Sequence, residues 1–172
     1  MKIYLKRNLE VKIDDLEAYG RRSNLEIQGL QTWDVEESKA IVVKLAELAS
    51  LTPALTRSDI VAAHRVGNFK TELPPYSIVK FVSKDQRNKI YSEVRGIDSL
   101  TPKKIFPEVN EDTKIYINEN LTPRRNYLRR LVKRTLASKD QNFVWSYNGK
   151  ISAKISVGEK AVGGRNFQCM KP

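Results

Sequence analysis

Apolar residues recur three or four positions apart over residues 5–19, which is the spacing of one face of a helix. The residues on this face are Leu5, Leu9, Ile13 and Leu16. Two turns of this spacing match the end of a coiled coil, and they equally match a single amphipathic helix that packs on the rest of the chain. Both alternatives stay open at the level of sequence. Gly20 then ends the helix before a polar hinge.

Between residues 24 and 120 the pattern switches repeatedly between the alternation of strands and the spacing of helices. Strands are predicted at 24–30, 60–66, 76–82 and 114–120, and helices at 35–50 and 84–95. This order is that of the ferredoxin-like fold, in which two helices cover one face of a four-stranded antiparallel sheet. The sequence therefore predicts an α+β protein in which the other face of this sheet is open.

The pattern changes again after residue 120. Thr122 followed by Pro123 is typical of a helix start, with threonine as the N-cap and proline in the first turn. This helix is predicted to run to about Ser138. Its apolar residues are expected to form the buried face, and they are Tyr127, Leu128, Leu131, Val132 and Leu136.

Residues 143–147 and 150–155 alternate between apolar and polar positions and are predicted to form two strands. Asn148-Gly149 between them is the strongest short-range signal of a β-hairpin. From Gly158 onward there is no periodicity, and a loose tail is expected. The predicted organisation is an N-terminal helix (1–20), a ferredoxin-like domain (21–120), a small basic α+β domain (121–157) and a tail (158–172).

The net charge of +11 is unevenly distributed along the chain. Residues 121–172 contain 12 Lys or Arg and only two acids, which gives a net charge of +10. Residues 1–120 contain 19 basic and 18 acidic residues, which gives +1. A local excess of this size favours a polyanionic partner such as nucleic acid. A basic surface that only aids solubility is the alternative.

The rest of the composition argues against several function classes. Cys169 is the only cysteine and His64 the only histidine, so we expect a free thiol, a structural histidine and no zinc site. Motifs of serine hydrolases and of phosphate-binding loops are absent. No apolar run is long enough to span a membrane, and the N-terminus lacks a signal-peptide core. We therefore expect a cytoplasmic or nuclear protein that is not an enzyme and has no cofactor.

The helix predicted from Thr122 carries much of the excess charge. Its basic residues follow two rows with a spacing of four, one starting at Arg125 and the other at Arg130. Guanidinium groups present planar donor forks that fit phosphate oxygens. A solvated helix face is the alternative reading of these rows. The predicted phosphate contacts are Arg124, Arg125, Arg129, Arg130, Lys133 and Arg134.

Aromatic side chains can stack on bases, at about 1–3 kcal/mol per base in single-strand binders. The third predicted strand lacks the aromatic pair of a stacking sheet, because Phe81 is expected in the core and Lys80 lies on the opposite face. Trp145 is likewise expected in the core. Tyr116 and Tyr147 are the alternative stacking residues.

Several segments resemble the first-open-reading-frame proteins of LINE-type retrotransposons, especially their arthropod branch. They are Tyr19–Gly29, Ala63–Val66, Ile78–Phe81 and Ile115–Pro123. Phe143-Val144-Trp145 followed by Asn148-Gly149-Lys150 is similar to the C-terminal domain of that family, and the same region resembles the baculovirus few-polyhedra protein. The resemblance covers roughly residues 13–157.

The resemblance implies an RNA-recognition-like domain and a small C-terminal domain that clamp single-stranded RNA, in a trimer held by a coiled coil. It also implies activity as a nucleic-acid chaperone. Arg129-Arg130 falls at a paired arginine of the family, Arg21-Arg22 at its basic hinge, and Arg95-Gly96 at a basic-glycine turn. This chain departs from the family pattern in having only a remnant of the coiled coil.

We therefore expect a sequence-tolerant binder of single-stranded RNA or DNA, with a homo-oligomer through the N-terminal helix and no membrane partner. The alternative is a protein-interaction or assembly module related to the few-polyhedra protein, in which the basic surface meets acidic proteins. Besides the six basic residues of the helix, the expected nucleic-acid contacts are Arg21, Arg22, Lys80, Arg95, Tyr147 and Lys150.

Overall fold

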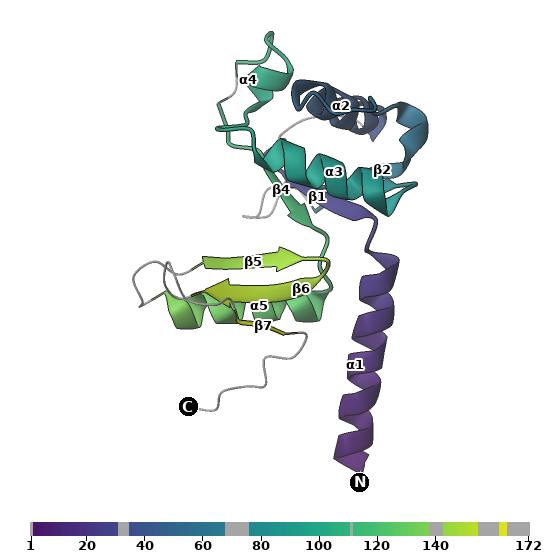
Figure 1. The fold of residues 1–172 in the computed structure, drawn as a ribbon, viewed down its shortest axis with the longest axis vertical. Helices are drawn as coiled ribbons and strands as arrows, with labels where there is room; N and C mark the ends of the chain where they lie inside the picture. The colour runs from purple at the N-terminus through teal and green to yellow at the C-terminus, as the bar shows by residue number, and fades with distance from the viewer. Residues whose placement is uncertain are drawn as a thin grey trace. The chain divides into compact units, whose positions relative to one another are not determined.

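The computed structural model describes residues 2–30, 35–67, 76–110, 112–137, 143–154 and 162–164. It divides into two compact units. Unit 1 combines residues 1–22 with residues 121–172, and unit 2 consists of residues 23–120. The N-terminal helix and the basic C-terminal region therefore belong to one unit, although the whole of unit 2 separates them in the sequence (Figure 1).

The protein is an α+β protein, as the sequence predicts. The elements of unit 1 are α1 (Lys2–Gly20), α5 (Pro123–Leu136), β5 (Phe143–Tyr147), β6 (Lys150–Lys154) and β7 (Val162–Gly164). Those of unit 2 are β1 (Asn24–Gln28), α2 (Val35–Leu48), the short 3-10 helix η1 (Arg57–Asp59), β2 (Ile60–Val66), β3 (Tyr76–Phe81), α3 (Lys84–Arg95), α4 (Pro102–Ile105) and β4 (Tyr116–Glu119).

Unit 2 has the predicted ferredoxin-like topology. Its four strands pair antiparallel in the order β2-β3-β1-β4, so that β2 and β4 form the two edges. Alternate residues of β1, β3 and β4, such as Leu25 and Ile27 on β1, are buried, and the apolar ones form a core shared with α2 and α3. Both helices lie on the same side of the sheet (Figure 1). Phe81 is 1% exposed, which confirms its predicted place in the core.

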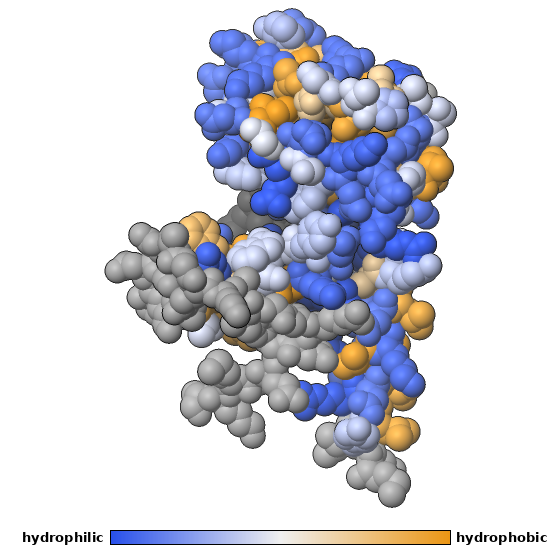
Figure 2. Space-filling model, in the orientation of Figure 1, coloured by the Kyte–Doolittle hydropathy of each residue, from blue (hydrophilic) through white to orange (hydrophobic). Residues whose placement is uncertain are grey.

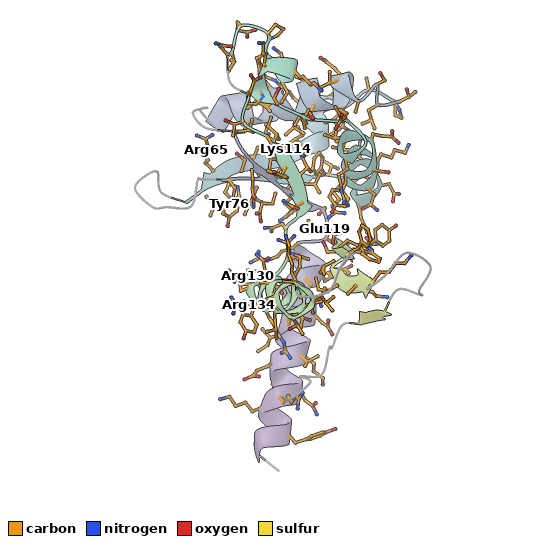
Figure 3. The ribbon with its side chains drawn as sticks, turned by 90° about the vertical axis from the view of Figure 1, so that its left-hand side faces the viewer. Arg65, Tyr76, Lys114, Glu119, Arg130 and Arg134 are labelled. Carbon is orange, nitrogen blue, oxygen red and sulfur yellow. The ribbon has the colours of Figure 1, made fainter. Side chains whose placement is uncertain are left out.

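A buried ion pair ties α3 to the edge strand β4. Arg87 Nη2 lies 3.0 Å from Glu119 Oε1, and both side chains are 3% exposed. Arg87 Nε also donates to the carbonyl oxygen of Asn24, 3.3 Å away. Charges at this depth require such partners, because an unpaired buried charge would destabilise the fold by several kcal/mol. The pair therefore joins α3 to Glu119, the last residue of β4, which is labelled in Figure 3.

Two short elements of unit 2, η1 and α4, were not predicted. The sequence suggests an irregular connection around Pro102 and Pro107, whereas residues 102–105 form the single turn α4. Proline occupies the first helical position, where its missing N–H has no intrahelical partner to lose. Pro102 and Ile105 are buried, so packing stabilises a turn too short to show a period in sequence.

In unit 1, α5 begins and caps as predicted but ends at Leu136, two residues early. β5 and β6 form the predicted hairpin, with Tyr147 paired to Lys150 across the two-residue turn. Asn148 and Gly149 both have positive φ angles, 50° and 72°, as a tight hairpin turn requires. Residues 162–164, within the predicted loose tail, instead pair with β6 as β7. Cys169 lies outside the described residues.

Candidate nucleic-acid interface

The N-terminus of α5 is held by the predicted cap. Thr122 is fully buried, and its Oγ1 accepts a hydrogen bond from the backbone N–H of Arg125 at 3.2 Å. The helix contacts β5 and β6, and its half-buried apolar side chains lie toward the hairpin. These side chains are Leu128, Leu131, Val132 and Leu136. The opposite side of α5 is left to solvent.

The exposed side of α5 carries four cations and one aromatic ring. We call it the α5 face, and it consists of Arg124, Tyr127, Arg130, Lys133 and Arg134. Arg130 and Arg134 are one helical turn apart and extend from the same side of the helix (Figure 3). No carboxylate of α5 neutralises them, since the helix contains no Asp or Glu.

Tyr127 corrects the sequence prediction, which placed it on the buried face. Its side chain is 62% exposed. At 100° per residue it lies about 20° from Arg134 and about 60° from Arg130 around the helix axis, seven and three residues before them. Classing every aromatic residue as apolar hides this position. The spacing to the two arginines is the signal that could have found it.

Arg125 is the second correction. It was predicted as a phosphate contact, but only 10% of its side chain is exposed. Its Nε lies 2.8 Å from Asp14 Oδ2 and its Nη2 lies 2.6 Å from Asp15 Oδ1, both on α1. Its Nη1 donates to the carbonyl oxygen of Gly149 at 3.2 Å. Arg125 therefore joins α1, α5 and the hairpin turn, and its guanidinium group is already fully engaged.

Arg129 is intermediate in exposure between the buried Arg125 and the exposed cations of the α5 face. It is half-buried, and its Nη2 donates to Asn126 Oδ1 at 3.3 Å. In the predicted row that starts at Arg125, Arg125 is buried, Arg129 is half-buried and only Lys133 is exposed. The row of Arg130 and Arg134 is the one that the structure leaves open to a ligand.

The hairpin presents a second surface, on the side of β5 and β6 away from the buried Ile151 and Ala153. Antiparallel pairing places Phe143 opposite Lys154, Trp145 opposite Ser152 and Tyr147 opposite Lys150. Because side chains alternate across a strand, all three aromatic rings lie on one face. We call this the hairpin face, and it consists of Phe143, Trp145, Tyr147, Lys150 and Lys154.

Of these three rings, Trp145 is the one whose exposure differs from the prediction. Phe143 is 50% and Tyr147 61% exposed, and Trp145, predicted in the core, is half-buried. The buried positions of β5 and β6 are instead Ser146, Ile151 and Ala153. The alternation of the strand carries this information, because Trp145 precedes the buried Ser146 and so lies on the other face of β5. Tyr147 and Lys150 both lie where a ligand could reach them.

The hinge arginines differ from each other. Arg21 Nη2 lies 2.6 Å from Glu17 Oε1, and Nη1 donates to the carbonyl oxygen of Leu121 at 3.3 Å. Arg22 is exposed, with its guanidinium carbon 3.4 Å from the centre of the Tyr19 ring. The hinge therefore offers Arg22 to a ligand more openly than Arg21.

In unit 2, Lys80 is exposed on the open face of the sheet, as predicted. The middle of that face is not a stacking platform, because Glu26 lies between Ile78 and Asn118 on the neighbouring strands. Glu26 Oε1 accepts a hydrogen bond from Gln28 Nε2 at 2.6 Å. The carboxylate makes the centre of the sheet unfavourable for a polyanion.

Two further predicted residues of unit 2 lie apart from Lys80. Arg95 is exposed in the last turn of α3, where its Nη1 donates to the hydroxyl of Tyr91 at 3.2 Å. His64 is exposed on β2, opposite Ile78 of β3. No Asp, Glu, Cys or second His of the described residues groups with it as a metal site.

Two groups with shifted pKa values lie in unit 2, and neither belongs to the α5 face or the hairpin face. The pKa of Asp59 is lowered, first by the hydrogen bond from Gln86 and then by those from Thr56 at the start of η1. Burial lowers the pKa of Arg65, which donates to the carbonyl oxygen of Leu30. Asp59 therefore holds the start of η1, whereas burial opposes the charge of Arg65.

The described helices include none that combines the length and apolar character needed to cross a membrane. Comparisons with known proteins leave the resemblance seen in sequence as a hypothesis. No protein-family model matches the chain, and the search of curated proteins finds no match to it.

Proposed function

We propose that this protein binds single-stranded RNA or DNA without strong sequence preference, and that it does so without catalysis. The observation that carries the proposal is the exposure of cations and aromatic rings together on unit 1. The α5 face supplies Arg124, Arg130, Lys133 and Arg134 around Tyr127. The hairpin face supplies three rings and two lysines.

The cations account for affinity. Four exposed basic side chains on one helix, with no acid among them, form a local field that attracts phosphates. Arginine contacts to phosphate oxygens position a strand but carry no information about its sequence. Binding through this face is therefore tolerant of sequence and sensitive to salt.

The aromatic rings account for the preference for single strands. Bases of a single strand can stack on Tyr127 or on the rings of the hairpin face, whereas bases in a duplex already stack on each other. Every base has a flat face, so stacking also tolerates sequence. A duplex would retain only the phosphate contacts and bind more weakly.

The resemblance to LINE-type first-open-reading-frame proteins supports RNA as the natural ligand and a chaperone role on it. Under this proposal the protein coats a single strand and lets strands exchange. The same resemblance supports oligomers through α1. Its apolar stripe is exposed in the single chain, at 60% for Leu5, 53% for Leu9 and 73% for Leu16 (Figure 2).

The contacts of α1 also support self-association rather than packing of the stripe on the rest of unit 1. Asp14 and Asp15 bind Arg125, so the acidic side of the helix is the one that faces α5. A second or third copy of α1 would pack against the stripe. This packing would remove several large apolar side chains from water. Light scattering of the purified chain tests this, and a monomer at all concentrations would contradict it.

The test of binding uses a labelled single strand of 20 nucleotides and its duplex, measured by fluorescence anisotropy. We expect tighter binding of the single strand. The double variant Arg130→Ala/Arg134→Ala removes two exposed cations and should weaken binding about 25-fold at 0.1 M salt, if each lost phosphate contact contributes about 0.7 log units. Equal affinity of the variant would contradict the role of the α5 face.

The matched control is Lys84→Ala/Lys89→Ala, which removes two exposed cations from a helix of unit 2 and changes the net charge equally. It should weaken binding far less. The alternative function, assembly with acidic proteins through the same basic surface, predicts instead that captured partners remain bound after nuclease treatment.

A further inference from the structure

Unit 2 contains a groove of about 410 Å³ at one edge of its sheet. One wall is formed by residues 94–100, which are the end of α3 and the loop after it, and the other by residues 114–118, which lead into β4. β4 is an edge strand, with β1 as its neighbour on one side. The groove thus lies beside the outer edge of this strand, and Lys114, labelled in Figure 3, is the first residue of its second wall.

The hydrogen-bonding pattern of the sheet fixes which backbone groups of β4 face the groove. The N–H of Phe81 donates to the carbonyl oxygen of Ser23 at 3.0 Å, so residues 23, 25 and 27 direct their backbone groups toward β3. Ile27 is paired with Ile117. Because Ile27 bonds to β3, the N–H and C=O of Ile117 point away from β1 and into the groove.

A second bond agrees with this direction. The N–H of Ile115, two residues earlier on the same side, donates outward to the carbonyl oxygen of Leu100 at 2.8 Å. Because the N–H of Ile115 is already bonded to Leu100, it is not available to a ligand. Among the residues that line the groove, Ile117 is the member of β4 whose donor and acceptor are both directed outward.

The number of β4 residues that direct their backbone N–H and C=O into the groove indicates which class of ligand can bind there. An added peptide strand exchanges pairs of bonds with every second residue of an edge and needs several such residues in succession. A nucleobase is flat and presents a donor and an acceptor side by side, so one residue's N–H and C=O can satisfy it. The geometry therefore favours a base over a peptide strand.

The side chains around Ile117 suit the rest of a nucleotide. Tyr116 is 52% exposed and can stack on a base. The ammonium group of Lys114 lies 5.6 Å from the centre of that ring, and the exposed Arg95 lines the facing wall. Asp98 is the acid of the lining, so the groove offers charge for one phosphate rather than for several.

The backbone at Lys114 is held in place by Gly29. A Cβ atom at Gly29 would overlap the carbonyl oxygen of Lys114, and Gly29 has a φ angle of 91°, which favours glycine. The chain before β4 can therefore approach β1 closely. The backbone of Lys114 therefore lies close to Gly29, at the start of the wall formed by residues 114–118.

We propose that this groove binds one nucleotide of a single strand. The base pairs with the N–H and C=O of Ile117 and stacks on Tyr116, and the phosphate contacts Lys114 and Arg95. The proposal deepens the proposed function and rests on it, since the strand that the α5 face and the hairpin face bind would supply the nucleotide. It assigns unit 2 a base-binding role at its edge strand and not at the centre of its open face.

The test is a titration of the full chain, labelled with ¹⁵N, followed by amide NMR shifts. The probes are uridine and adenosine 5′-monophosphate, with inorganic phosphate as the control for charge alone. We expect a nucleotide to shift the amide of Ile117 and phosphate to leave it unchanged. Tyr116→Ala should weaken nucleotide binding about tenfold, and Tyr116→Phe should retain it. Asp98→Asn should strengthen it.

Three outcomes would overturn the proposal: no shift of Ile117 with either nucleotide, the same shift with inorganic phosphate, or a larger shift with an extended acidic peptide. A titration with a 20-nucleotide strand separates this failure from failure of the proposed function. If the strand binds while the Ile117 amide stays unchanged, the groove is wrong and the function stands. If the strand does not bind, the function itself is wrong.

Discussion

Arg125 offers the sharpest test of how unit 1 is held together. Replacing it with methionine keeps the unbranched apolar stem and the helix propensity of the side chain but removes the charge that Asp14 and Asp15 contact. The methionine also cannot donate to the carbonyl oxygen of Gly149. We expect the loss of these contacts to destabilise unit 1 and to leave the exposed cations of the α5 face unchanged.

The magnitude follows from the burial of the partners. Removing one member of a fully buried ion pair destabilises a protein by about 3–5 kcal/mol. Asp14 is 13% exposed and approaches this limit, whereas Asp15 is 44% exposed and adds little, as surface pairs do. We therefore expect Arg125→Met to lower the free energy of unfolding by about 3 kcal/mol. In a domain of this size that corresponds to a fall in Tm of roughly 10–20 °C.

Tryptophan fluorescence during urea unfolding can report this change for unit 1. The chain has two tryptophans, and in a Trp33→Phe background Trp145 of β5 is the remaining one. Arg124→Met, at the exposed neighbouring position, is the matched control and should change the free energy by less than about 0.5 kcal/mol. Adding Asp14→Asn to Arg125→Met should recover part of the loss, because it removes the unpaired carboxylate. Equal effects of Arg124→Met and Arg125→Met would refute the reasoning.

Three further predictions follow from single contacts. Leu16→Glu, in the exposed stripe of α1, should shift any oligomer toward monomer in light scattering without unfolding the chain, and an unchanged mass distribution would argue against self-association through α1. Gly149→Ala should destabilise unit 1 by about 1–2 kcal/mol, because the residue has a positive φ angle and the new Cβ would lie 2.7 Å from Arg125 Nη1. Thermal unfolding measures this change, and a variant as stable as the wild type would contradict it. The pKa of Asp59 is lowered, so its hydrogen bond from Gln86 stabilises the fold above about pH 4 and is lost as the pH falls through the folded pKa. Asp59→Asn should therefore reduce the fall of the urea midpoint below about pH 4, and a profile parallel to wild type would show that Asp59 contributes nothing.

Local signals predicted most of the fold. The alternation of strands 60–66 and 76–82, the cap at Thr122 and the Asn148-Gly149 turn each act over a few residues, and each element formed where it was expected. These signals depend on backbone geometry and burial on one face, which a period can reveal. The single turn α4 gave no period, because four residues complete about one turn.

The errors at the candidate site have a different physical origin. Arg125 was taken as a surface cation because its partners, Asp14 and Asp15, precede it by 111 and 110 residues. No local pattern connects positions so far apart in the chain. Tyr127 and Trp145 were assigned to the core by residue type, although the helix and strand periods place them on exposed or half-exposed faces. For amphipathic side chains, the period is the better guide.

The salt dependence of single-strand binding tests the central claim most directly. The affinity of the full chain for a 20-nucleotide strand is measured between about 50 and 200 mM salt, for the wild type and for Arg130→Ala/Arg134→Ala. The account predicts a steep fall of log K with log salt for the wild type, and a slope smaller by about 1.4 in the variant, because two phosphate contacts are lost. Binding that is absent, insensitive to salt, or identical in slope for the two proteins would contradict it.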